Sequence, residues 1–284
     1  MSDPATVFEP HRRFLVGVAY RMLGSVAEAE DVVQDAYLRW EGVAIEERAQ
    51  IIEPRAYLAR VVTRLCLDRM KSARATRETY VGTWLPEPIV EGPGPSEIAD
   101  DLSVALLMTL ERLSPLERAA FLLHDVFDMD YSAIAGVLER SEAACRQLAT
   151  RAREHVRDER PRFEPSREAE ARLTAAFAAA MMSGDTGALT HLLAEDAVFY
   201  SDGGGKRRAA LHPIYGRDKI VRFFIGIQRK SAVPESADPV RINGLPGFVL
   251  HVADGVETIS LETSGEQIVA IYAIRNPDKL RHLS

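Results

Sequence analysis

Residues 25–40 read SVAEAEDVVQDAYLRW, and their spacing predicts an amphipathic helix. Ser25 and Glu28 form a capping box, in which two side chains satisfy backbone N–H groups that the first helical turn leaves free. Apolar side chains then recur every three or four residues, from Ala29 to Trp40. The opposite face is polar and consists of Glu28, Asp31, Gln34, Asp35 and Arg39. We therefore expect an all-helical first domain, at residues 1–79.

A second helix is expected to begin near Pro54, because proline suits the first turn of a helix. Between Arg55 and Arg77 the chain carries seven basic residues and one acidic residue, although its net charge is −7. Net charge says little where charges are segregated along a chain. This basic stripe therefore favours a nucleic-acid partner over a merely solvated helix, and its candidate DNA-binding residues are Arg60, Arg64, Arg69 and Lys71.

Residues 80–100 are dense in glycine and proline, which exclude helix and strand interiors and predict a linker. The segment Trp84-Leu85-Pro86-Glu87-Pro88 is more than a spacer, because a tryptophan and a leucine in a linker usually dock on another part of the protein.

A second helical domain is expected at residues 101–163. Ser114-Pro115-Leu116-Glu117 is a strong helix start. A short helix at 131–138, a tight turn and a longer helix at 143–157 form a helix-turn-helix pattern. The exposed face of the longer helix offers groups that contact base edges and phosphates: Arg146, Gln147, Thr150, Arg151 and Arg153.

The turn of this motif departs from the common pattern. Glu139 and Arg140 stand where a glycine and an apolar residue are frequent. A non-glycine residue there costs about 1 kcal/mol if the turn needs a positive φ.

The third block, residues 167–284, changes character. Helices are expected at 169–182 and 186–193, then strands at 197–200, 240–242, 248–253, 258–262 and 267–274, with a further helix at 217–228. Helices followed by antiparallel-type strands predict an α+β domain with one curved sheet. The chain is thus expected to be multidomain, two all-α domains followed by one α+β domain.

Composition narrows the possible classes of protein. The Ala/Met-rich run at 175–182 is far below the roughly 20 residues of a membrane-spanning helix. The N-terminus is polar and lacks the apolar core of a signal peptide. Cys66 and Cys145 lie far apart, and we expect both to be buried in apolar packing rather than bound to zinc. We expect a cytoplasmic protein with no cofactor, no metal and no membrane partner.

Two regions resemble one known family. Residues 28–40 (EAEDVVQDAYLRW) and 56–69 (AYLARVVTRLCLDR) resemble the core-binding and minus-10-reading regions of extracytoplasmic-function sigma factors. Residues 113–118 (LSPLER) and 141–153 resemble their minus-35-reading domain. The resemblance implies an alternative sigma factor that binds core RNA polymerase and promoter DNA, and not an enzyme. It assigns core-polymerase docking to the polar helix face, for which a merely solvated face is the alternative: Glu28, Asp31, Gln34, Asp35 and Arg39. Many relatives have asparagine where Arg64 stands, so their base preference at minus-10 is not carried over.

Three short motifs imply a group within that family, in which a SnoaL-like, cone-shaped domain is fused to the sigma factor. They are residues 84–88 (WLPEP), 202–206 (DGGGK) and 276–280 (NPDKL). The group implies that the fused domain modulates activity in cis. The linker motif would be a docking strip, and its expected partners are Asp202, Gly203, Gly204, Gly205, Lys206, Asn276, Pro277, Asp278, Lys279 and Leu280.

Two alternatives concern the inside of the cone. Tyr200, Asp202, His251 and Tyr272 could line a cavity in which Asp202 acts as a catalytic base, as in related cyclases and isomerases. The cavity could instead admit a small molecule that shifts the domain packing. Against the enzyme, Asp202 opens a Gly-Gly-Gly turn, which indicates a mobile, exposed loop rather than a rigid catalytic wall.

Overall fold

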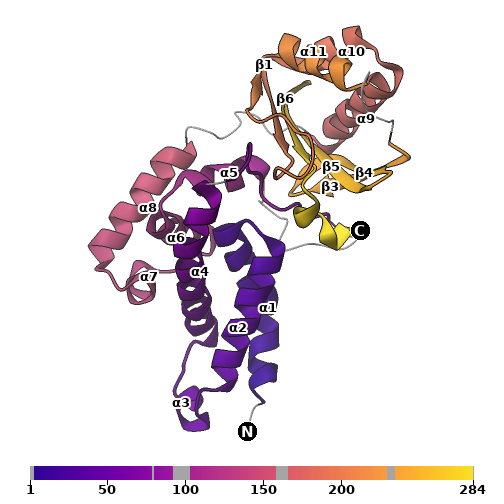
Figure 1. Cartoon of the computed structure of the whole chain (residues 1–284). Coiled ribbons are helices and arrows are strands. Elements are labelled where there is room, and N and C mark those ends of the chain that lie inside the picture. Colours follow the sequence, from indigo (N-terminus) through magenta and orange to yellow (C-terminus); the bar gives the residue numbers. More distant parts are fainter. Residues whose placement is uncertain (1–2, 79, 92–102, 158–165, 229–233, 284) are drawn as a thin grey trace. The chain divides into compact units, whose positions relative to one another are not determined.

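The computed structural model describes residues 3–78, 80–91, 103–157, 166–228 and 234–283 (Figure 1). The predicted linker beyond residue 91 and the edges of the second predicted domain, at 101–102 and 158–163, lie outside these ranges. The chain divides into two compact units. Helices α1 to α8 belong to the first, while residues 80–91 group with the C-terminal part in the second.

The first unit begins with four helices, three of which pack around a shared apolar core. They are α1 (Pro4–Leu23), α2 (Val26–Glu41), α3 (Ile45–Ala49) and α4 (Pro54–Glu78). Ser25 caps α2 through the backbone N–H of Glu28, as the sequence predicts. Buried Leu15, Val33 and Leu58 come from α1, α2 and α4 respectively, so burial of one apolar stripe on each holds these three helices together, whereas α3 has no buried residue.

The remaining helices of this unit are α5 (Val104–Arg112), α6 (Pro115–Phe121), the π-helical turn η1 (Leu122–Val126), α7 (Tyr131–Leu138) and α8 (Glu142–Arg157). The capping box of Ser114 and Glu117 is formed, with both of its hydrogen bonds. Helices α7 and α8 form the predicted helix-turn-helix. The π-helical turn was not predicted, because its sequence is as apolar as the helix before it.

The turn between α7 and α8 has a backbone conformation that is unfavourable for the non-glycine residue found there. Glu139 ends α7 with φ +54°, in the left-handed region that favours glycine. The turn therefore does need a positive φ, the condition under which the sequence analysis expected a cost of about 1 kcal/mol.

The second unit begins with the helices α9 (Arg167–Ser183) and α10 (Thr186–Leu192). Its strands are β1 (Leu193–Asp202), β2 (Ile214–Tyr215), β3 (Ser236–Ile242), β4 (Leu245–Val252), β5 (Gly255–Ser264) and β6 (Gln267–Ile274). Helix α11 (Arg217–Gln228) follows β2, and the short 3-10 helices η2 (Pro277–Lys279) and η3 (Arg281–Leu283) end the described chain.

These strands form one sheet in the order β2-β1-β6-β5-β4-β3. The β1–β6 pair is parallel and the other pairs are antiparallel. Phe177 of α9 and Phe224 of α11 pack with Phe199 of β1 and Ile271 of β6, so the helices cover one face of the sheet (Figure 1). This α+β arrangement confirms the predicted fold class, although β1 starts four residues earlier than expected, at Leu193, where an α10 residue was predicted.

Two predictions about the whole chain can be compared with the described residues. Cys66 and Cys145 are both buried, as expected. None of the helices in the described ranges is both long enough and apolar enough to cross a membrane.

Candidate nucleic-acid interface and linker clamp

The polar face of α2 is presented as the sequence predicts. Asp31, Gln34, Asp35 and Arg39 are exposed, and Glu28 is half-buried in the first turn. These side chains share one face because they recur at three- and four-residue intervals on a helix whose other face is buried. The arrangement can dock on a partner protein.

The basic residues of α4 are individually engaged. Arg69 contacts Asp31 at 3.4 Å and Asp35 at 3.5 Å on α2, and Lys71 contacts Asp68 at 2.9 Å. Arg60 lies over the ring of Tyr57, 5.6 Å from its centroid. These basic residues all lie on α4. Through its contacts with α2, Arg69 connects the predicted DNA-binding surface to the predicted partner-docking face.

Arg64 makes three side-chain hydrogen bonds, all of them outside its own helix. Its Nε donates to the carbonyl of Val137 at 3.2 Å, and its terminal nitrogen donates to the carbonyl of Gly136 at 3.2 Å and to the Glu139 carboxylate at 2.7 Å. All three acceptors belong to the end of α7. No sequence pattern indicated that this residue would contact the helix-turn-helix.

The exposed face of α8 carries four of the predicted DNA-contacting residues, Arg146, Gln147, Thr150 and Arg151. Arg146 pairs with Glu142 one turn earlier, at 2.7 Å, in an exposed contact that can be exchanged for another anion. A helix with such a face can enter the major groove of DNA.

Arg153 is placed differently from those four. Its Nε contacts Asp125 at 2.6 Å and its terminal nitrogen contacts the Tyr131 hydroxyl at 3.0 Å. These bonds tie α8 to η1 and to the first residue of α7, so Arg153 positions the helix in this structure.

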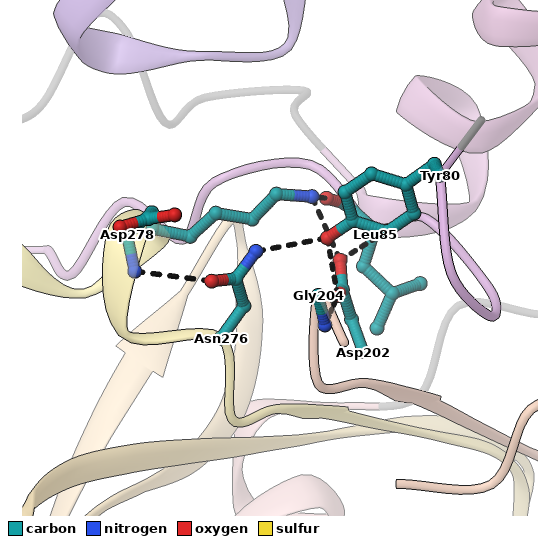
Figure 2. Close-up of polar contacts among 7 residues, drawn as sticks. Tyr80, Leu85, Asp202, Gly204, Asn276 and Asp278 are labelled. Atoms are coloured by element: carbon teal, nitrogen blue, oxygen red, sulfur yellow. Dashed lines mark hydrogen bonds and ion pairs between the residues drawn. The ribbon is translucent and has the colours of Figure 1, made fainter. Parts of the chain in front are cut away.

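A second candidate site lies in the other unit, where the linker meets the end of β1. Asp202 is 1% exposed, and its carboxylate accepts four hydrogen bonds (Figure 2). Oδ1 accepts from the Tyr80 hydroxyl at 2.6 Å and from the Gly204 N–H at 3.0 Å. Oδ2 accepts from the Leu85 N–H at 2.9 Å and from the Lys279 ammonium at 2.7 Å. We call Tyr80, Leu85, Asp202, Asn276 and Lys279 the linker clamp.

Lys279 closes the clamp from the opposite side. Besides its ion pair with Asp202, its ammonium donates to the carbonyl of Leu85. It lies 4.2 Å from the ring centroid of Trp84 and 5.0 Å from that of Tyr80, so both aromatic faces stabilise the charge. One lysine therefore touches both ends of the Tyr80–Leu85 segment.

The tyrosine of the clamp remains a neutral donor. Burial, and then the hydrogen bond to the Asp202 carboxylate, raise the pKa of the Tyr80 phenol. Its oxygen also accepts from the Asn276 side-chain amide at 2.9 Å, as Figure 2 shows.

Steric crowding explains why the 202–206 motif contains glycine. Gly204 has φ +58°, and a side chain there would overlap the amide of Asn276. Lys206, at the end of the motif, pairs with Asp278 at 2.5 Å. This bond, and then the one from Arg281, lower the pKa of Asp278. The second and third motifs thus hold each other as well as the linker.

Four of the five residues of the linker motif are buried, and Trp84 is half-buried. Leu85, Pro86, Glu87 and Pro88 are all buried, Glu87 contacts His282 at 3.3 Å, and Leu280 is 1% exposed beneath the third motif.

Two anchors of the linker were missed by the sequence analysis. Asn243, at the β3–β4 turn, accepts from the Ile89 N–H through its side chain at 3.0 Å and donates its own N–H to the Ile89 carbonyl at 2.9 Å. Val90 forms a bridge with Ile242. Asn243-Gly244 is a hairpin-turn signal, but nothing in the sequence says that this turn also binds a segment over 150 residues away.

Two sequence-based expectations about the cone are wrong. Asp202 is not part of an exposed, mobile loop, because four donors hold its buried carboxylate. Nor do the cavity candidates converge: Tyr200 and Tyr272 stack at 5.3 Å, and His251 pairs with Asp238 at 2.9 Å. A hollow of about 610 Å³ lies between α9 and strands β3 and β4, and other residues line it, among them Thr174, Pro239 and Phe248. With both oxygens occupied by protein donors, Asp202 is an anchor and not a poised base.

Comparison with known proteins shows the family to which the chain belongs. The family model described as Sigma-70 region 2 matches residues 7–76, and the model described as Sigma-70, region 4 matches residues 103–156. The ECF RNA polymerase sigma factor SigJ of Mycobacterium tuberculosis is 38% identical over 289 residues, which cover 96% of this chain and 91% of SigJ. A probable ECF sigma factor of the same species, SigI, is 31% identical over 98% of this chain and 95% of SigI.

A solved structure extends the likeness to the whole fold. The crystal structure of M. tuberculosis SigJ matches with a TM-score of 0.80 at 37% identity, covering 98% of both chains. Two sigma-type domains, one with a basic helix and the other with a helix-turn-helix, define a transcription-initiation protein that binds DNA. The chain belongs to the extracytoplasmic-function RNA polymerase sigma factors. It is an alternative sigma factor, and it directs transcription initiation.

Proposed function

We propose that the C-terminal unit restrains this sigma factor in cis by holding the linker between its two promoter-reading domains. The observation that carries the proposal is the burial of Asp202 beneath the linker, with bonds to Tyr80, Leu85 and Lys279. The same carboxylate thereby joins the linker, β1 and the C-terminal segment.

The position of the linker explains why its docking matters. It connects the segments that match region 2 and region 4 of sigma factors, at 7–76 and 103–156. Residues 80–91 would reach about 40 Å if extended, and docking removes this freedom. In this proposal the two domains separate for promoter binding only when the linker is released from the C-terminal unit.

We assign the other predicted surfaces as follows. The polar face of α2 docks on core RNA polymerase. Arg60, Arg64, Arg69 and Lys71 follow the separated minus-10 strand, because a single strand needs a basic groove along its phosphates. Arg146, Gln147, Thr150 and Arg151 read the minus-35 element from the major groove, with Arg153 nearer the phosphates. Acting with polymerase on promoters, the protein works in the cytoplasm.

Run-off transcription with core polymerase tests the restraint. Asp202→Asn removes the charge that Lys279 and Leu85 engage and is expected to release the linker. If the docked form is favoured by one to two kcal/mol, its loss raises cognate transcription about fivefold or more. Tyr80→Phe, which removes one hydrogen bond, is expected to have a smaller effect in the same direction.

The matched control is Asp196→Asn, the same change at an exposed position of β1. It is expected to transcribe like the wild type. Co-purification with core polymerase and circular dichroism verify that each variant binds core and folds. Unchanged transcription by a folded, core-binding Asp202→Asn protein would rule out the restraint.

A further inference from the structure

Two arginines in the first unit cap helices that belong to different sigma regions. Arg64, in the region-2 segment, donates to the carbonyls of Gly136 and Val137 in the last turn of α7. Arg118, in the region-4 segment, donates at 2.6 Å to the carbonyl of Met22 in the last turn of α1. Each region thus places a cation at the C-terminus of a helix in the other region, where the helix dipole attracts positive charge.

The carbonyls that Arg64 contacts need an outside donor. The last carbonyls of a helix have no intrahelical partner. At the end of α7 the N–H groups of Glu139 and Arg140 both donate to the carbonyl of Ala135. Arg64 therefore supplies the hydrogen bonds that the turn itself does not give to Gly136 and Val137.

Glu139 adds a carboxylate at the same point. It occupies a φ of +54°, which is unfavourable for any residue with a Cβ, yet its side chain pairs with Arg64 at 2.7 Å. The pair is exposed, with 41% of the Arg64 side chain and 74% of the Glu139 side chain accessible. Exposed pairs add little to stability. The Glu139 carboxylate therefore makes the contact specific for Arg64 but adds little to its free energy. We call Arg64 with Gly136, Val137 and Glu139 the arginine latch.

The latch conflicts with simultaneous reading of the two promoter elements. Their positions differ by 25 base pairs, which is roughly 80 Å along a duplex. In the latched form a residue of α4 lies within hydrogen-bonding distance of the helix before α8. Furthermore, Arg64 has committed Nε and a terminal nitrogen to protein acceptors.

We propose that the arginine latch keeps the free sigma factor closed, and that Arg64 exchanges the end of α7 for promoter DNA when the two regions separate. The promoter half of this statement rests on the proposed function, in which α4 follows the minus-10 strand. The closed state is a property of the free protein and can be tested without polymerase or DNA. Opening must also break the bond from Arg118 to Met22, but Arg64 is the contact that DNA can replace, because its side chain is 41% exposed whereas that of Arg118 is 2% exposed.

The test is a distance measurement by single-molecule energy transfer in the full-length protein. Labels are attached at cysteines introduced at Glu30 of α2 and Glu154 of α8, both exposed. Burial raises the pKa of the native Cys66 thiol and also that of Cys145, so neither competes for the label. The variants are Arg64→Ala and Glu139→Gln, and Arg60→Ala is the matched control one helical turn away.

The wild type and Arg60→Ala are expected to show mainly the short distance. Arg64→Ala is expected to raise the ratio of open to closed molecules about fivefold or more, and Glu139→Gln by a smaller factor. Glu139 is so exposed that its substitution leaves folding intact, and circular dichroism checks the same for Arg64→Ala.

Wild-type ratios in both variants would overturn the latch. Promoter binding is measured separately, with core polymerase present. If Arg60→Ala leaves promoter binding unchanged while Arg64→Ala opens the free protein, the assignment of α4 to the minus-10 strand fails and the latch stands.

Discussion

The linker clamp and the arginine latch both end in a cation–carboxylate pair, but water reaches them very differently. The Lys279 and Asp202 side chains are 12% and 0% exposed, whereas those of Arg64 and Glu139 are 41% and 74% exposed. A buried pair is costly to break, because the remaining charge stays desolvated. An exposed pair is readily exchanged for water or another anion. The chain therefore combines one firm attachment, of the linker, with one contact that is suited to exchange.

The largest expected effect comes from breaking the buried pair on one side only. Lys279→Met leaves the Asp202 carboxylate buried without its cation and is expected to destabilise the second unit by about 3–5 kcal/mol. Adding Asp202→Asn is expected to recover part of this loss. Urea unfolding followed by Trp84 fluorescence measures it, because Trp84 lies against the Lys279 ammonium.

Lys206→Met is the control for this cycle, since Lys206 is half exposed and pairs with Asp278. It is expected to lose less than about 1 kcal/mol. Equal losses in the free energy of unfolding for Lys206→Met and Lys279→Met would show that the buried pair contributes no more to stability than the exposed pair.

A smaller effect is expected from salt. Raising the salt concentration screens exposed charges far more than buried ones. The fraction of open molecules in the energy-transfer experiment should therefore rise with salt, while amide protection at Leu85 stays constant. If both quantities change in parallel, the two pairs do not differ in the way that their burial indicates.

The smallest effect is expected at the turn itself. Glu139→Gly relieves the positive φ, worth about 1 kcal/mol, but loses the exposed pair with Arg64. Asp128→Gly is the matched control, because Asp128 has φ +56° in the same region and an exposed side chain. Urea unfolding is expected to show a greater gain for Asp128→Gly than for Glu139→Gly. The reverse order would mean that the latch contributes nothing to stability.

Local signals in the sequence were enough to predict most elements. Ser25 and Ser114 start helices through bonds that involve only the next three residues, and the apolar spacing of α2 and α4 reports which face is buried. At Glu139, the common helix-turn-helix pattern, which often has glycine there, indicated where a positive φ would be costly. Such features depend on short stretches of chain and are visible there.

The contacts between distant segments were not predictable in this way. The three motifs indicated that residues near 84, 202 and 276 belong together, but not that Tyr80 and Asn243 would complete the linker site. Asp202 was misjudged as exposed because the glycines that follow it usually indicate a loose turn. Here they allow the close approach of Asn276 instead. The bonds of Arg64 to α7 join positions more than 70 residues apart and left no pattern in either segment.

Amide hydrogen exchange at the linker tests the central claim most directly. The N–H of Leu85 is bonded to Asp202, and that of Ile89 is bonded to Asn243. Exchange at residues 83–91 is measured in the free protein and in its complex with core polymerase on a cognate promoter. The account predicts protection in the free protein and its loss in the promoter complex. Equal protection in both states would contradict it, because the linker would then remain docked while the sigma factor works.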